Sequence, residues 1–224
     1  MKTRAIILKK QNINEYDQLV ICYTEEFGKI TAIAKSVLKP SSIQAMHLDI
    51  FNLVDFELVA GSASWRMPII TGAQAEAVCS NLKSNLNHVA VAYFFAETID
   101  KLFFEYQKDK RLWDFLSSLL VELDSDSDDP KEFLKSKQME FLNILGYTFN
   151  LNDCSFCSAL TGGKLVAYSI ETKGAICQDC FLGGRQGIVL KGGVWQSPEV
   201  IGALFESLAE KKLYSLNFLD FVIR

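Results

Sequence analysis

Two Cys-x-x-Cys pairs constrain the fold of this chain more than any other feature of the sequence. The first pair is Cys154 and Cys157, the second is Cys177 and Cys180, and nineteen residues separate the pairs. Two such pairs at this separation are the usual ligand set of a four-thiolate zinc site, because each pair turns two sulfurs toward one tetrahedron. The insert has turn glycines on both sides of an alternating segment, residues 164–170, so we expect a β-excursion between two metal-binding turns.

Disulfides, a redox dithiol and an iron–sulfur cluster are the competing uses of four cysteines. No signal peptide is recognisable, and Cys22 and Cys79 lie in apolar runs, which disfavours a secreted disulfide scaffold. Because these runs are strand-like, we expect both residues to be buried packing residues. A redox dithiol needs one pair at the start of a helix in a βαβ context, which is absent. Four thiolates also bind iron–sulfur clusters, and the sequence leaves this alternative open. With no histidine or open ligand position indicated, we predict one structural zinc ion.

Length and composition indicate a soluble globular protein with one large domain or two small ones. The chain has 224 residues, of which 49% are hydrophobic and 22% charged. No apolar run approaches the roughly eighteen residues of a membrane helix. Because the cysteines look reduced and no targeting segment is recognisable, we expect a cytoplasmic protein without membrane contact.

The charge distribution is uneven along the chain. The formal net charge is −4, which by itself argues against a nucleic-acid partner. Residues 1–42, however, hold seven basic and four acidic side chains, a net charge of +3, so the remainder carries −7. The amino-terminal region is therefore the cationic part of the chain, where a nucleic-acid partner would bind.

The first eighty residues are predicted to be β-structure. Apolar, β-branched or alternating segments are separated by turn residues, and they occupy 4–10, 19–24, 30–34, 48–59 and 65 to about 78. Pro68 restricts the last of these to an edge or a bulge. Five strands without a crossover helix favour the five-stranded oligonucleotide-binding (OB) barrel as the fold of residues 1–80. In this barrel Tyr16, Tyr23, Phe27 and Trp65 are as readily buried as available to stack on bases.

From about residue 82 the apolar period changes to three and four, which predicts helices. The predicted helices are one of about twenty residues that includes 89–103, one at 111–123, one from Pro130 to Gly146, one from Pro198 and one at 213–223. The acidic run 124–129 is interpreted as a linker. The predicted fold class is α+β, in which residues 81–224 form a helical domain that contains the zinc ribbon at about 151–190.

The sequence contains no pattern typical of an enzyme active site. His47 and His88 are far apart in the sequence, and no glycine-rich phosphate-binding loop occurs. Glu15 and Asp17 are interpreted as part of a solvated hairpin turn rather than an acid–base pair. A zinc-dependent hydrolase is also disfavoured, because four thiolates leave no position for a water molecule. We therefore predict a protein that is not an enzyme.

Several motifs follow one another in an order typical of one protein family. In chain order they are residues 4–10, Glu15-Tyr16-Asp17-Gln18-Leu19-Val20, Thr24-Glu25-Glu26-Phe27-Gly28-Lys29, Ala32-Ile33-Ala34-Lys35, Leu142-Asn143-Ile144-Leu145-Gly146-Tyr147 and Ser215-Leu216-Asn217-Phe218-Leu219. Over nearly its whole length the sequence resembles the RecO family of bacterial recombination mediators. The order of these motifs, together with the four cysteines, makes the similarity fairly specific. One departure is that residues 36–38 are Ser-Val-Leu, where family members usually carry more basic residues and a glycine.

The resemblance implies an OB barrel docked on a helical domain that a zinc ribbon interrupts. It also implies binding to single- and double-stranded DNA and annealing of complementary strands. With RecR as a partner, such proteins help RecA to displace the single-strand DNA-binding protein, whose acidic carboxyl-terminal tail they contact. These are mediators rather than enzymes, and their expected location is the bacterial cytoplasm, at the nucleoid.

The candidate DNA-contacting residues are the cations of the amino-terminal region. The resemblance places Lys35 and Lys39 on the loop after the third strand, and we expect these two to contact phosphates first. The supporting candidates are Arg4, Lys9, Lys10 and Lys29. Two alternatives remain: these side chains only solubilise strand ends, or the protein is a zinc-stabilised interaction adaptor whose OB barrel no longer binds nucleic acid.

Overall fold

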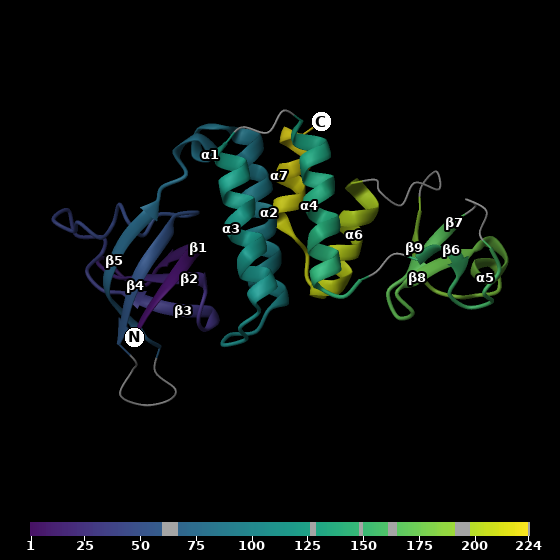
Figure 1. The fold of residues 1–224 in the computed structure, drawn as a ribbon, viewed down its shortest axis with the longest axis horizontal. Coiled ribbons are helices and arrows are strands. Elements are labelled where there is room, and N and C mark those ends of the chain that lie inside the picture. Colours follow the sequence, from purple (N-terminus) through teal and green to yellow (C-terminus); the bar gives the residue numbers. More distant parts are fainter. Residues whose placement is uncertain (60–66, 126–128, 148–149, 161–164, 191–197, 224) are drawn as a thin grey trace. The chain divides into compact units, whose positions relative to one another are not determined.

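The computed structural model describes residues 1–59, 67–125, 129–147, 150–160, 165–190 and 198–223 (Figure 1). The chain divides into two compact units. The first contains residues 1–130 together with 217–224, and the second contains residues 131–216. The boundary expected between residues 80 and 81 lies inside the first unit.

The first unit begins with a closed five-stranded barrel of the predicted OB type (Figure 1). Its strands are β1 (Lys2–Asn12), β2 (Gln18–Thr24), β3 (Gly28–Ala34), β4 (Leu53–Val59) and β5 (Ile69–Ala77). They close in the order β1-β2-β3-β5-β4. Strand β1 pairs antiparallel with both β2 and β4, whereas β3 and β5 pair in parallel and complete the barrel.

Alternate residues along each strand point into the barrel, and their side chains form its core. Inward positions hold β-branched, aromatic and small residues, and the buried cluster includes Ala5, Ile7, Val20, Cys22, Ile30, Ala32, Ala34, Val54, Phe56, Leu58 and Ile70. The register of β1 against β2 shifts between Ile7 and Lys9, as at a β-bulge. A bulge bends its strand, so this one strand pairs with β4 at one end and β2 at the other.

Strands β4 and β5 are both shorter than the sequence pattern predicted. The fourth strand was expected from residue 48, but 48–52 forms turns and β4 begins at Leu53. Asn52 is fully buried there, and its side-chain amide donates to the carbonyls of Met46 and His47. The expected start of the fifth strand, residues 65–66, lies outside the described residues, and β5 begins at Ile69.

The three helices α1 (Ser80–Ser84), α2 (Leu86–Leu102) and α3 (Lys110–Asp124) follow the barrel. Asn85 has extended backbone geometry, so it separates α1 from α2, and its side chain accepts a hydrogen bond from the N–H of Asn87 at 3.0 Å. Asp109 caps α3 in the same way, accepting from the N–H of Arg111. Helices α2 and α3 pack through the edge-on rings of Phe95 and Phe115.

The α2–α3 loop is docked on the barrel by hydrogen bonds. The hydroxyl of Tyr23, a fully buried residue, accepts from the N–H of Asp109 at 3.0 Å. The N–H of Tyr106 donates to the carbonyl of Lys29 at 2.9 Å. The sequence left burial and base stacking as alternatives for Tyr23. Because its ring is buried beneath this loop, Tyr23 is unavailable for stacking.

Gly28 is required where the same loop crosses the barrel. Its φ is +71°, and an added Cβ would lie 2.1 Å from the carbonyl oxygen of Gln107. We expect Gly28→Ala to destabilise the protein by about 2–4 kcal/mol, through backbone strain together with the clash. Gly184→Ala is the matched control, since Gly184 has φ +92° but nothing within 4 Å, and its cost should stay near about 1 kcal/mol. Equal shifts of the two denaturant midpoints would contradict the clash.

The second unit contains helices and a small sheet. Helix α4 (Pro130–Ile144) leads into β6 (Asn150–Cys154), β7 (Leu165–Ser169), β8 (Gly174–Cys177), α5 (Gln178–Leu182) and β9 (Ile188–Val189). The sheet order is β6-β8-β7-β9. Helix α6 (Pro198–Ala209) packs on α4 through the stacked rings of Phe141 and Phe205. The following helix, α7 (Tyr214–Val222), begins in the second unit and belongs to the first from residue 217. In the described part of the chain, every helix is too short or too polar to cross a membrane.

Cys22 and Cys79 are buried, as expected of packing residues. Cys22 is 0% exposed inside the barrel, and Cys79 is 7% exposed. Their expected placement in strands is right for Cys22 in β2 and wrong for Cys79, which has φ 48° and precedes α1. Burial raises the pKa of both thiols, so less nucleophilic thiolate forms.

We expect Cys22 and Cys79 to resist alkylation in the native protein and to react on unfolding. Mass spectrometry after a short iodoacetamide pulse measures both sites, and the exposed Cys157 in metal-chelated protein is the positive control. Rapid native labelling of Cys22 or Cys79 would contradict their role as packing residues.

Candidate metal centre and nucleic-acid interface

The four cysteines predicted to bind metal come together in the second unit. Cys154, Cys157, Cys177 and Cys180 place their Sγ atoms within 4.8 Å of one another. The Sγ atoms of Cys157 and Cys177 are 3.7 Å apart. A tetrahedral ion with bonds of about 2.3 Å separates its sulfurs by about 3.8 Å, so the spacing fits one four-coordinate ion.

Backbone structure positions these sulfurs. Cys154 ends β6 and Cys177 ends β8, two strands that pair in parallel. Behind Cys154 the chain turns, since the N–H of Ser158 donates to the Cys154 carbonyl at 2.9 Å, and this turn carries Cys157. Cys180 lies on the short helix α5. One local turn, one short helix and one strand pairing therefore suffice to assemble the site.

Hydrogen bonding makes the thiols unequal. Burial opposes ionisation of Cys154, but N–H groups, first that of Cys177, outweigh it and lower the pKa of Cys154 to about 6. The hydrogen bond with Cys157 is the largest of the effects that raise the pKa of Cys180 to about 12. Four negative sulfurs at this separation repel each other, and a bound divalent cation removes that repulsion.

The spacing of the four sulfurs is that of ligands around a single four-coordinate metal ion. All six cysteines are free, so disulfides do not account for the arrangement. With four thiolates around one ion, no ligand position is open, and the group can support structure but offers no site for a reacting water.

Two of the predicted DNA-contacting cations share one acid. Lys29 is only 8% exposed, and its ammonium donates to the backbone carbonyl of Asp100 at 2.5 Å and lies 3.4 Å from its carboxylate. Lys9 is exposed and lies 3.8 Å from the other carboxylate oxygen of Asp100. The structure therefore places Lys29 as a buried connection between β3 and α2 rather than on an open surface.

Arg4 and Lys10 are also paired with acids. Arg4 contacts the carboxylate of Glu76 at 2.9 Å, and its guanidinium lies 5.7 Å from the centre of the Trp113 ring. Lys10 binds Asp49 at 2.9 Å. Each of these charges is thus partly neutralised, which weakens its attraction for phosphate.

Lys35 and Lys39 differ from the other four candidates. Both are exposed on the turn that follows β3, and in the described part of the chain no ion pair joins either ammonium to a carboxylate. The Lys39 Nζ lies 5.2 Å from the centre of the Tyr16 ring, which is 49% exposed. Of the aromatic residues considered for stacking, Tyr16 is therefore the accessible one, while Phe27 packs against the barrel core and Trp65 lies outside the described residues.

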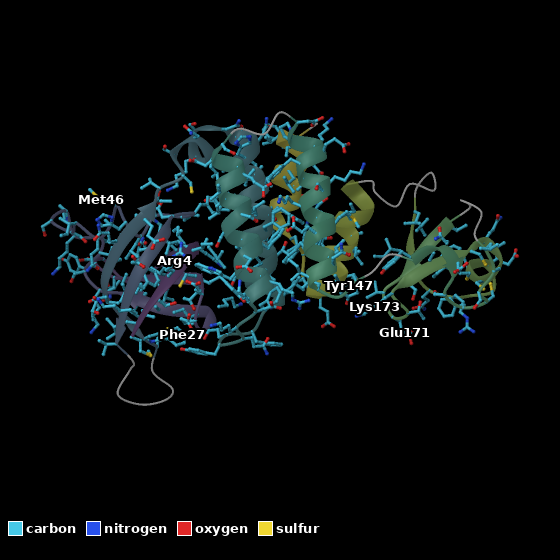
Figure 2. The ribbon with its side chains drawn as sticks, viewed as in Figure 1. Arg4, Phe27, Met46, Tyr147, Glu171 and Lys173 are labelled. Carbon is cyan, nitrogen blue, oxygen red and sulfur yellow. The ribbon has the colours of Figure 1, made fainter. Side chains whose placement is uncertain are left out.

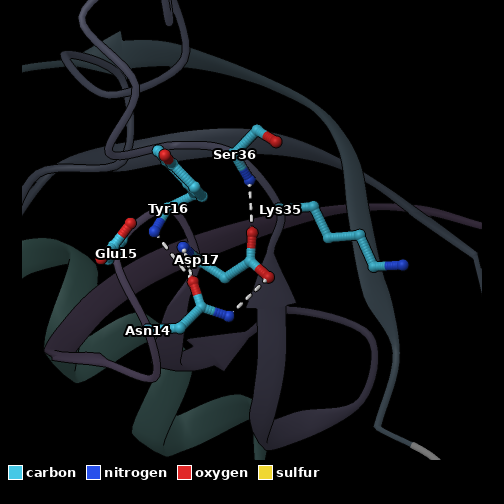
Figure 3. A pocket seen from close by; sticks show the side chains of 6 residues that line it. All are labelled: Asn14, Glu15, Tyr16, Asp17, Lys35 and Ser36. Carbon is cyan, nitrogen blue, oxygen red and sulfur yellow. Dashed lines mark hydrogen bonds between the residues drawn. The ribbon is translucent and has the colours of Figure 1, made fainter.

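A shallow pocket of about 450 Å³ lies beside this turn (Figure 3). Its lining residues come from the β1–β2 turn and from the turn after β3, and they are Asn14, Glu15, Tyr16, Asp17, Lys35 and Ser36. The sequence interpretation treated Glu15 and Asp17 as a solvated turn and so missed the contact between Asp17 and Ser36. An Asn three residues before an Asp, at a turn, is the one local signal that indicated side-chain-to-backbone bonding.

Comparison with known families agrees with both halves of the chain. The amino-terminal family "Recombination protein O N terminal" matches residues 1–74, and "Recombination protein O C terminal" matches residues 83–208. The chain belongs to the RecO family. The second match includes helices α2 to α5 and all four cysteines of the metal centre.

Individual RecO proteins are moderately similar to this chain. "DNA repair protein RecO" of Dehalococcoides mccartyi strain BAV1 is 31% identical over 179 residues, which cover 80% of this chain and 69% of the relative. Its namesake from Thermoanaerobacter sp. strain X514 is 29% identical, covering 80% and 71%. That from Desulfitobacterium hafniense strain DCB-2 is 27% identical, covering 95% and 75%. The sequence resemblance to this family is thereby confirmed.

Proposed function

We propose that this RecO-family protein is a recombination mediator that binds single- and double-stranded DNA and anneals complementary single strands. In this proposal, the barrel of the first unit holds DNA through Lys35 and Lys39. The protein then helps a recombinase to replace the single-strand DNA-binding protein on single-stranded DNA. Binding, rather than any bond-making step, is the activity.

The observation that carries the proposal is the unequal pairing of the barrel cations. Four of the six candidates contact carboxylates, whereas Lys35 and Lys39 are exposed with no such partner in the described part of the chain. A lysine contributes to DNA binding when its ammonium neutralises a phosphate and displaces the counterions condensed there, and an ammonium already paired with a carboxylate does this less well. An OB barrel that presents two such lysines on one turn, in a chain of a DNA repair family, is suited to single-strand binding.

The metal in this proposal is zinc, in a structural role. Four sulfurs at the spacing of a single tetrahedral ion are the ligand set that zinc prefers. Bound zinc would supply rigidity to the ribbon. The residues Cys154, Cys157, Cys177 and Cys180 would hold it, and the strands β6 and β8 bring them together.

RecR and the acidic tail of the single-strand DNA-binding protein are the protein partners we infer. Membership of the RecO family supports both. The DNA partner has the additional support of the exposed lysines.

Fluorescence anisotropy of labelled single-stranded DNA, titrated with this protein at two salt concentrations, tests the proposal. We expect binding at low salt that weakens as salt rises, because each lysine–phosphate contact releases counterions; with few contacts available, the affinity should be modest and the salt slope shallow. An annealing assay with complementary strands should show faster pairing than without protein. Strand pairing no faster than in buffer, together with no binding at low salt, would contradict the mediator function.

The second candidate, an interaction adaptor, is favoured by the same charge pairing. Because Arg4, Lys9, Lys10 and Lys29 are neutralised by acids, much of the cationic character counted in the sequence is lost at the surface. An adaptor would bind RecR without binding either DNA form. The anisotropy titration separates the two candidates.

A further inference from the structure

Two turns of the barrel are joined through one carboxylate (Figure 3). Asp17, in the β1–β2 turn, accepts a hydrogen bond at its Oδ1 from the backbone N–H of Ser36, at 2.7 Å. The same two turns meet again where the N–H of Leu38 donates to the carbonyl of Tyr16 at 3.0 Å. The turn after β3 carries both exposed lysines, so these contacts decide where their side chains begin.

Asn14 orients the carboxylate. Its Nδ2 donates to Asp17 Oδ2 at 3.1 Å, so each carboxylate oxygen has its own donor. Its Oδ1 accepts from the N–H groups of Tyr16 and Asp17, both at 2.8 Å. The amide of Asn14 is therefore locked in one orientation, because a flip would place its NH₂ group against two donors.

The turn that Asp17 holds is backbone-strained. Ser36 has φ 57°, in the left-handed region that a serine rarely adopts. Such a conformation persists only when surrounding contacts determine it, and the bond from its N–H to Asp17 is the shortest contact that does so. Without that acceptor, we expect the turn to populate other conformations, so that the backbone at Lys35 and Lys39 is no longer held in one position.

A carboxylate beside these lysines is electrostatically unfavourable for DNA. Hydrogen bonds from Ser36 and then Asn14 lower the pKa of Asp17, with smaller effects of Lys35 and Lys39, so it is ionised at neutral pH. Figure 3 shows the Lys35 side chain extending away from Asp17 rather than pairing with it. If only charge mattered, removal of Asp17 would strengthen DNA binding. If the turn that Asp17 holds matters more, removal would weaken binding because Lys35 and Lys39 are no longer positioned.

We propose that Asp17 is a positioning residue for DNA: its carboxylate holds the turn after β3 so that Lys35 and Lys39 meet phosphates without first being ordered. This inference rests on the proposed function, and it adds to it the residue that preorganises the contact. Ordering long side chains during binding weakens affinity, which a fixed turn avoids.

The test compares Asp17→Ala, Asp17→Asn and the exchanged pair Asn14→Asp with Asp17→Asn. In Asp17→Asn, with the new amide oxygen accepting from Ser36, the new NH₂ group faces the NH₂ group of Asn14, so the hydrogen bond between the two side chains is lost. In the exchanged pair, the amide at position 17 donates to the carboxylate at position 14, and the net charge is that of the wild type. With labelled oligothymidylate at low salt, we expect both single variants at position 17 to bind roughly tenfold more weakly although each removes a negative charge. The exchanged pair should return to within about twofold of wild type.

Hydrogen exchange of the peptide containing Ser36 supplies a readout independent of DNA. Its N–H should exchange faster in Asp17→Ala and regain protection in the exchanged pair, with thermal denaturation confirming that all variants fold. Two results would overturn the inference about Asp17 while leaving the proposed DNA binding intact. One is unchanged or tighter DNA binding by Asp17→Asn, and the other is an exchanged pair that binds DNA as weakly as the single variants. If wild type does not bind oligothymidylate, the proposed function fails and the inference fails with it.

Discussion

Replacing Cys157 with serine is expected to release the metal and unfold the ribbon. A structural zinc ion contributes on the order of 10 kcal/mol to the folding of small zinc-binding domains. The sheet around this site is small, and its last strand, β9, has two residues. We therefore expect metal content to fall from about one ion per chain to nearly none, with faster proteolysis within residues 150–190.

Elemental analysis of protein purified without added metal measures the first effect, and it also identifies the ion. Cys157→His is the conservative variant and should retain part of the metal, because imidazole is also a zinc ligand. Glu171→Gln, at an exposed position in the turn between β7 and β8 of the same ribbon, is the control and should leave metal content unchanged. Iron with visible absorbance, or metal-free wild type with intact thiols, would contradict a zinc site.

Reversing the charge of both Lys35 and Lys39 is expected to weaken DNA binding on the order of 10²-fold at low salt, because two attractive contacts become repulsive. The effect should be the same for every sequence, since phosphate contacts carry no base information. The dependence of log affinity on log salt should become shallower by about two. Anisotropy titrations over a series of salt concentrations measure both quantities.

The control for this variant carries the same change in charge elsewhere on the first unit. Lys108 and Lys110 are exposed, and Lys108 binds Glu26 at the turn that precedes β3, whereas Lys35 follows the other end of that strand. Replacing both by glutamate should leave affinity within about threefold of wild type, because distant exposed charges are screened. Equal losses in the two double variants would show a diffuse electrostatic effect, and the proposed site would then be wrong.

The strand boundaries show where sequence periodicity stops being informative. Leu48 was expected to begin the fourth strand, and it is fully buried, yet it lies in a turn. Periodicity reports burial, and a turn that folds back on the barrel buries apolar residues as effectively as a strand does. The start of helix α4 was predicted more closely, because Pro130 is a local signal that acts on its own turn.

The sign and number of charges were readable from the sequence, but their pairing was not. Arg4 contacts Glu76, 72 positions away, and Lys29 contacts Asp100, 71 positions away. Each contact is created by barrel closure or by docking of α2 on the barrel. The count of seven cations in residues 1–42 therefore overestimated the unpaired positive charge of this region.

The sequence by itself determined the barrel, the helical region, the family and the four cysteines that meet, because each depends on local spacing or on periodic burial. Metal-binding turns form from neighbouring residues, so the order of the cysteines was sufficient to predict their meeting. Only the tertiary structure decided which lysines remain free and that Asp17 holds their turn. Those features depend on segments brought together by barrel closure, and no local pattern encodes a contact between side chains that distant strands supply.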